Sequence, residues 1–225
     1  MLSDYQTLTD VLVADTSGRI TPEMRDMAVN LALFRYSADR PQIKLCEIVH
    51  DGGLFLPLPE EWTDGVSRVL AVEYPAGRIP PERIAAETVT TLSGEKIMLK
   101  AAVAAGERMI LTYTAAHVLT DEEETIPAVD REAVANWAAA LLLDSLSSSY
   151  AGDMASTIAA DSVEHGAKGA NYAARAAACR KFYRDHMGLD DKRNAAAGTT
   201  VVVRRNGTSG RFGIVQRRRG DGQSL

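Results

Sequence analysis

Two long stretches in the second half of the chain place apolar residues three and four positions apart, the spacing of one face of a helix. They cover residues 128–151 and 162–187. The apolar positions of the first stretch are Val134, Trp137, Ala138, Leu141, Leu142 and Leu146, and those of the second are Tyr172, Ala176, Cys179 and Tyr183. The pattern predicts two long helices. Asp130 or a neighbour is expected to cap the first, and Gly188 is expected to end the second in a left-handed conformation.

The N-terminal part of the chain predicts two shorter helices. The first covers residues 4–14. The second is predicted to begin at Thr21-Pro22-Glu23, because threonine is a favoured cap and proline suits the first helical turn. It is predicted to end before Pro41, since proline disfavours helical conformation in the preceding residue. Its expected apolar stripe is Met24, Met27, Ala28, Leu31 and Phe34 or Tyr36.

Between these helical parts, apolar and polar residues alternate, which is typical of strands. The expected strands cover residues 43–49, 54–59, 66–74, 87–92, 96–100 and 108–115. Turn-forming residues separate them, and Ser93-Gly94-Glu95 predicts a hairpin. No segment among them is long enough to form a crossover helix. The sequence therefore predicts an antiparallel sheet or a small barrel.

The predicted fold class is α+β: a helical bundle with an inserted small antiparallel β-domain and an extended C-terminal arm. Four parts follow from the change of pattern along the chain. They are N-terminal helices over 1–42, the β-insertion over 43–119, long helices that complete the bundle over 120–188, and a basic arm over 189–225 that includes a possible β-hairpin.

Charge is distributed unevenly along the chain. The chain has a net charge of −5, yet residues 192–225 contain eight basic residues and one acidic residue, a net charge of +7. The first 191 residues therefore carry −12. An acidic body with a basic tail is typical of a tail that meets an acidic partner, either protein or nucleic acid, although basic tails also serve solubility alone.

Nothing in the sequence predicts a membrane protein or a secreted one. No apolar run approaches the about 20 residues that span a bilayer, and the acidic, polar N-terminus argues against a signal peptide. Two cysteines predict neither a disulfide framework nor a zinc site. Synthesis in a cytoplasm is expected.

Candidate chemistry is sparse. The histidines at 50, 117, 165 and 186 lack ligand spacing, and no phosphate-binding loop or nucleophile elbow occurs. His117 and His165 are expected at the surface or at helix ends, while Cys46 and Cys179 are expected to be small buried apolar residues. The acidic run 121–124 is expected to be a solvated linker, although carboxylate pairs can bind metal. We therefore predict no catalytic residues and no cofactor, and an enzyme is the least favoured class.

Four segments together resemble the head-to-tail connector, or adaptor, proteins of tailed bacteriophages. They are RYSADRP at 35–41, DGVSRVLAVEYPAG at 64–77, VDREAVANWAAALL at 129–142 and TIAADSVEHGAK at 157–168. The resemblance covers about residues 1–188. It implies a helical core with an inserted β-domain and a structural role without enzymatic activity. Members form a ring, typically of twelve copies, beneath the portal, and extend the DNA channel towards the tail.

The resemblance implies a set of partners and a place in the virion. The expected partners are the portal protein, further copies of the same chain, a downstream stopper or tail protein, and double-stranded DNA that passes without sequence-specific binding. The expected location is the neck of the virion, after synthesis in the host cytoplasm.

The resemblance also implies a C-terminal arm that grips the portal, here residues 189–225. Charge and hydrophobicity select its candidate portal-binding residues: Val201, Val203, Arg204, Arg205, Arg211, Phe212, Ile214, Arg217, Arg218 and Arg219. Apolar residues can add a strand to a sheet edge, and arginine binds carboxylates in a bidentate manner. Ala174 and Ala177, in the alanine-rich segment 167–178, are the candidate subunit-interface residues, because small side chains permit close approach.

Two other functions remain open on the sequence alone. One is a stopper or tail-completion ring of the neck, although such proteins are usually smaller and mostly β. The other is an accessory protein that binds nucleic acid through its arginine-rich tail.

Overall fold

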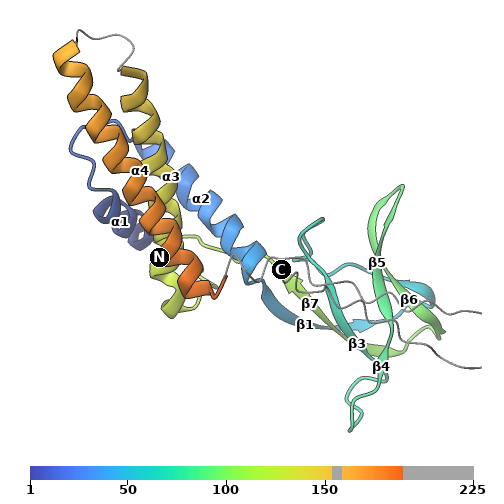
Figure 1. Ribbon diagram of the computed structural model, residues 1–225. Coiled ribbons are helices and arrows are strands. Elements are labelled where there is room, and N and C mark those ends of the chain that lie inside the picture. The colour runs from blue at the N-terminus through green and yellow to red at the C-terminus, as the bar shows by residue number, and fades with distance from the viewer. Residues whose placement is uncertain (154–158, 190–225) are drawn as a thin grey trace, which may run out of the picture. The chain divides into compact units, whose positions relative to one another are not determined.

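The computed structural model describes residues 1–153 and 159–189, and within them the protein has an α+β fold (Figure 1). Helices α1 (Leu2–Val13) and α2 (Pro22–Asp39) precede the strands, and a short 3-10 helix, η1 (Ala128–Asp130), leads into α3 (Arg131–Asp153) and α4 (Ala159–Met187). Two small antiparallel sheets are inserted between α2 and η1. The predicted fold class is confirmed. The predicted arm from residue 190 onward lies outside the described residues.

The start of α2 follows from its local sequence, as predicted. Thr21 has extended backbone angles, and its hydroxyl accepts a hydrogen bond from the N–H of Met24 at 3.3 Å. Pro22 occupies the first helical position, where its missing N–H costs no hydrogen bond. The helix ends at Asp39, two residues before Pro41.

The predicted apolar stripe of α2 is confirmed in part. Ala28 and Tyr36 are buried as predicted, but Met27, Leu31 and Phe34 are exposed, and Val29 and Ala32 are buried in addition. The predicted stripe therefore combined residues from two sides of this helix.

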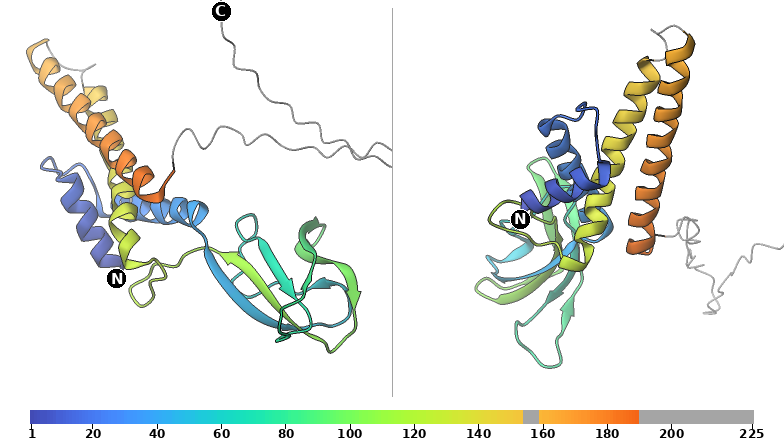
Figure 2. Two further views of the ribbon diagram at one scale, coloured as in Figure 1. Left: turned by 60° about the horizontal axis from the view of Figure 1, so that its bottom comes forward. Right: turned by 90° about the vertical axis from the view of Figure 1, so that its left-hand side faces the viewer.

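Helix α3 is the centre of the helical part, and α1, α2 and α4 all pack against it. Figure 2 (right) shows α3 between α1 and α4. We predicted one broad apolar face, but α3 is buried almost all round over much of its length. The buried positions are Ala133, Val134, Ala135, Ala138, Ala139, Ala140, Leu142, Leu143 and Leu146. A helix with neighbours on several sides has no solvent face to carry a polar stripe.

The predicted apolar face of α4 is confirmed. Tyr183 and Ala176 are buried, and the half-buried Tyr172 stacks on Tyr150 of α3 at 5.5 Å between ring centroids. Tyr183 packs on Trp137 of α3 with the two rings tilted by 51° and their centroids 4.8 Å apart. Gly188 has the predicted left-handed conformation, with φ of 66°.

The sheets contain short strands joined without a crossover helix. One sheet has the order β1-β7-β3-β4 and the other has the order β2-β6-β5. Every strand pair is antiparallel, as predicted, and β5 and β6 form the predicted hairpin around Ser93 and Gly94. The bounds are β1 Gln42–Val49, β2 Gly53–Leu56, β3 Val69–Glu73, β4 Arg83–Ile84, β5 Ala86–Thr91, β6 Gly94–Val103 and β7 Arg108–Ala115.

Both sheets contribute to one apolar core. Its fully buried side chains include Val72, Ile97, Leu99, Met109 and Leu111. Burial alternates along strand β1: Cys46 and Ile48 turn towards this core, whereas Ile43, Leu45, Glu47 and Val49 are exposed. The exposed side therefore carries apolar residues that the alternating sequence pattern did not predict there. Among the described helices, none combines the length and the apolar character needed to cross a membrane.

Candidate functional site

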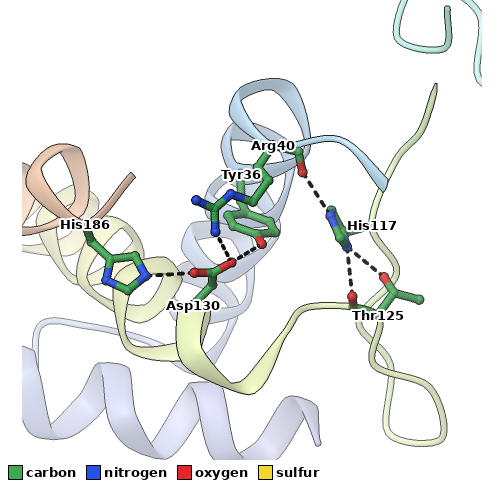
Figure 3. Close-up of polar contacts among 6 residues, drawn as sticks. All are labelled: Tyr36, Arg40, His117, Thr125, Asp130 and His186. Carbon is green, nitrogen blue, oxygen red and sulfur yellow. Dashed lines mark hydrogen bonds and ion pairs between the residues drawn. The ribbon is translucent and has the colours of Figure 1, made fainter. Parts of the chain in front are cut away.

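A cluster of polar side chains surrounds Asp130, where the connection from the sheets enters α3 (Figure 3). Its carboxylate is almost fully buried and accepts hydrogen bonds from three side chains. Tyr36 donates from its hydroxyl at 2.6 Å, and Arg40 donates from Nη1 at 2.7 Å. His186, near the end of α4, contacts the other carboxylate oxygen through Nε2 at 2.7 Å. One carboxylate therefore ties the end of α2 to the end of α4.

The role predicted for Asp130 was a helix cap, and the structure gives it a different one. Its carboxylate oxygens bind side chains from α2 and α4. Burial alone raises the pKa of a carboxyl, but hydrogen bonds from Tyr36, His186 and Arg40 outweigh it and lower the pKa of Asp130. Burial, together with the hydrogen bond to Asp130, raises the pKa of Tyr36. The pair is therefore an ionised acceptor with a neutral donor.

His117 lies beside this cluster and is buried, contrary to the surface position predicted for it. Its ring packs on Tyr36 with centroids 4.9 Å apart. Nε2 lies 3.0 Å from the carbonyl oxygen of Arg40, and Nδ1 lies 3.0 Å from the hydroxyl of Thr125. A neutral ring with its hydrogen on Nε2 donates to the carbonyl of Arg40 and accepts from the hydroxyl of Thr125 through Nδ1, which also lies 3.1 Å from the carbonyl oxygen of Thr125. Burial lowers the pKa of His117, which favours this neutral form.

A second cluster corrects the prediction for the acidic run 121–124. Glu124 is buried, and it accepts a hydrogen bond from the hydroxyl of Tyr5 at 2.7 Å. Arg131, in the first turn of α3, binds both of its carboxylate oxygens, at 3.0 and 2.7 Å. Burial and the hydrogen bond to Glu124 raise the pKa of Tyr5. Glu124 therefore joins α1 to α3, while Asp121, Glu122 and Glu123 are exposed as predicted.

These clusters hold elements together rather than present reactive groups. The Asp130 carboxylate is enclosed and both of its oxygens are used, so a substrate cannot reach it without breaking the contacts between α2 and α4. Among the residues that the structure describes, no group of three or more histidine, cysteine, aspartate or glutamate side chains is placed to hold a metal ion.

The surface offers a different kind of candidate site, because large apolar side chains are exposed on two elements. On α2, Met27, Leu31 and Phe34 are 65%, 54% and 65% exposed. On β1, which lies at the edge of its sheet, Ile43, Leu45 and Val49 are exposed. Contiguous exposed apolar residues are typical of surfaces that bind another protein. The described part of the chain leaves both of these surfaces uncovered.

The candidate interface residues Ala174 and Ala177 are both exposed on α4. The buried face of the same helix carries Ala176 and Tyr183, so the two alanines lie on its opposite side. Cys46 and Cys179 are only half-buried, less than predicted. The side chain of His165 lies outside the described residues.

The candidate portal-binding residues also lie outside the described residues. They are Val201, Val203, Arg204, Arg205, Arg211, Phe212, Ile214, Arg217, Arg218 and Arg219. Their role remains a prediction from sequence.

Sequence reasoning identified Met27, Leu31 and Phe34 as apolar stripe residues of α2 but did not predict that they are exposed, although their spacing carried a signal for a contact with another helix. Met27, Leu31, Phe34 and Ala38 are separated by four, three and four residues, which is the seam of a helix that packs against another helix. It also missed the Asp130 cluster. No sequence signal predicts that cluster, because its members are far apart along the chain.

Comparison with known proteins adds no assignment: no protein-family model matches the sequence, and the curated proteins contain no significant match.

Proposed function

We propose that this protein is the structural subunit of an adaptor ring in the neck of a tailed bacteriophage. In this role, copies of the chain form a ring, typically of twelve, that docks beneath the portal protein. The ring connects the head to the tail, extends the DNA channel and receives a stopper or tail protein below. DNA passes through without sequence-specific binding, and the subunit catalyses no reaction.

The observation that carries the proposal is the exposed apolar face of α2. A subunit that acts alone has no use for three large apolar side chains in water on one helix face, whereas a subunit of a ring buries such a face against its neighbour. The resemblance of four segments to adaptor proteins supports this kind of assembly. The observed insertion of antiparallel sheets into a helical bundle agrees with what that resemblance implies.

The proposed roles of individual residues follow from the same reasoning. Ala174 and Ala177 are exposed on α4 and belong to the subunit contact. Residues 189–225 form the arm that holds the portal, with valine, phenylalanine and isoleucine as apolar anchors and arginine as the partner of carboxylates.

Light scattering coupled to size-exclusion chromatography tests the proposal. The purified chain is measured alone and after mixing with rings of the portal protein of the same phage. We expect self-association into a ring and co-elution with the portal. A chain that stays monomeric and ignores portal rings contradicts the proposal.

The charge of the tail favours one second candidate, an accessory protein that binds nucleic acid. Residues 192–225 carry a net charge of +7, and arginine-rich segments bind phosphates with strong dependence on salt. A gel-shift assay separates the two functions. Submicromolar affinity for double-stranded DNA at physiological salt, without portal, favours the second candidate. A stopper ring is less consistent with helices of 23 and 29 residues.

A further inference from the structure

We propose that α2 of one copy packs antiparallel against the exposed side of α4 in the next copy, and that this contact repeats around the ring. The inference rests on the proposed function, because it requires that copies of the chain associate with one another. It adds the identity, direction and register of the contact.

The first surface is the outer seam of α2, defined as Met27, Leu31, Phe34 and Ala38. All four residues are exposed. They lie opposite the buried side of the helix, where Ala28, Val29, Ala32 and Tyr36 are held by neighbouring elements. The seam is therefore presented on a fixed helix, and its spacing of four, three and four residues suits packing against a second helix.

The second surface is the outer alanine face of α4, defined as Ala167, Ala170, Ala174 and Ala177. All four residues are exposed, opposite the side that packs on α3. Small side chains leave shallow depressions that accept large ones from a facing helix. The two surfaces also match in length, since they span 12 and 11 residues of helix, about 16 Å each at a rise of about 1.5 Å per residue.

Charge selects the direction of packing. Glu23 lies four residues before Met27 and extends the outer seam of α2 towards its N-terminus. Lys181 lies four residues after Ala177 and extends the outer alanine face of α4 towards its C-terminus. Both side chains are exposed. Antiparallel helices place these opposite charges at the same end of the contact. In that register Met27 faces Ala177, Leu31 faces Ala174, and Phe34 faces Ala170.

The wider charge distribution favours the same pairing. Residues 1–40 contain six acidic and four basic residues, a net charge of −2, whereas residues 167–187 contain five basic and one acidic, a net charge of +4. Complementary charge steers the two surfaces together, and like charge disfavours a contact between two α2 surfaces or between two α4 surfaces. The proposed contact is heterologous, because α2 of one copy meets α4 of the next without the reciprocal contact between the same two copies. A heterologous contact forms a ring where its rotation closes.

The first test weakens the seam with a double substitution, Leu31→Ser with Phe34→Ser. Sedimentation over a range of concentrations should show the dissociation constant for self-association raised at least tenfold. The matched control is Leu70→Ser on β3, a leucine that is 52% exposed against 54% for Leu31 and lies outside both exposed apolar surfaces; it should leave association unchanged. Thermal unfolding checks that the variants fold. Unchanged association in the double variant overturns the inference.

The second test reads the direction of packing by charge reversal. Glu23→Lys or Lys181→Glu alone should weaken association about threefold, a size typical of ion pairs near the surface, and the two reversals together should restore it. If the double reversal weakens association by the sum of the two single effects, the antiparallel register is contradicted.

The third test is cross-linking with a short bis-maleimide in a background that carries Cys46→Ser and Cys179→Ala. A chain with both Leu31→Cys and Ala174→Cys should give a ladder of covalent oligomers. Either substitution alone should give none, as should Val11→Cys combined with Ala174→Cys. Cross-linking of Leu31→Cys chains to one another indicates a symmetric contact between two α2 helices and overturns the inference.

Failure of the inference and failure of the proposed function give different results. Seam variants that still form rings able to bind the portal refute the contact and leave the proposed function standing. A wild-type ring that ignores the portal but loses association in the seam variants refutes the function and leaves the contact standing. A chain that stays monomeric and never cross-links refutes both.

Discussion

Replacing Asp130 with alanine tests whether one buried carboxylate holds α2 and α4 together. The substitution leaves the hydroxyl of Tyr36 enclosed without its acceptor. A hydrogen bond to a charged group is worth about 2 kcal/mol. Arg40 and His186 are 48% and 32% exposed, so water replaces much of what they lose, and together they add about 1 kcal/mol. We therefore expect the free energy of unfolding to fall by about 3 kcal/mol.

Urea unfolding followed by circular dichroism measures this change, and a thermal scan should show the midpoint lowered by about 6 to 12 °C for a chain of this size. Tyr36→Phe is the matched control, because it removes only the hydroxyl. It should cost about 1.5 kcal/mol in the wild-type chain and close to nothing in the Asp130→Ala chain. Equal costs in the two backgrounds, or a loss below about 0.5 kcal/mol for Asp130→Ala, would refute the reasoning.

Three further predictions concern pH, assembly and the tail. Burial lowers the pKa of His117 below its usual value of 6.5, so the unfolded chain takes up a proton at higher pH than the folded one. The free energy of unfolding should thus fall as pH drops below about 6.5, more steeply in the wild type than in His117→Gln; parallel curves contradict this. Replacing Ala174 and Ala177 by leucine should block ring formation at unchanged thermal stability, since both are exposed; normal rings in light scattering remove them from the interface. Deleting residues 199–225 should leave a folded protein that no longer co-sediments with portal rings, and charge reversal at Arg217–Arg219 should make that binding weaker and more sensitive to salt. Full-strength binding by the truncated chain shows that the tail is not the anchor.

Local sequence signals predicted the boundaries of several elements well. Thr21 and Pro22 mark the start of α2, and Gly188 takes the left-handed conformation that follows α4. The alternating pattern predicted β7 at Arg108–Ala115 and the hairpin of β5 and β6. These features depend on residues adjacent in the chain, through capping hydrogen bonds, allowed backbone angles and side-chain alternation. Such interactions form between near neighbours in the chain and do not depend on tertiary contacts.

The orientation of helices was harder to predict, because periodicity reveals an apolar face but does not identify what covers it. Helix α2 has Met27, Leu31 and Phe34 on its exposed side, whereas its buried side combines small residues with Tyr36. The exposed apolar side suits a contact between chains. A single sequence does not distinguish burial within a subunit from burial between subunits, since both remove apolar surface from water.

The sequence by itself determined the α+β class, the order of its elements and the capping of α2, since each depends on near neighbours and on the period of the apolar pattern. Only the tertiary structure decided the roles of Asp130, His117 and Glu124. A carboxylate in a polar segment can equally be solvated, cap a helix or be buried among donors. Which of these occurs depends on whether donors such as Tyr36, 94 positions away along the chain, reach it when the helices pack.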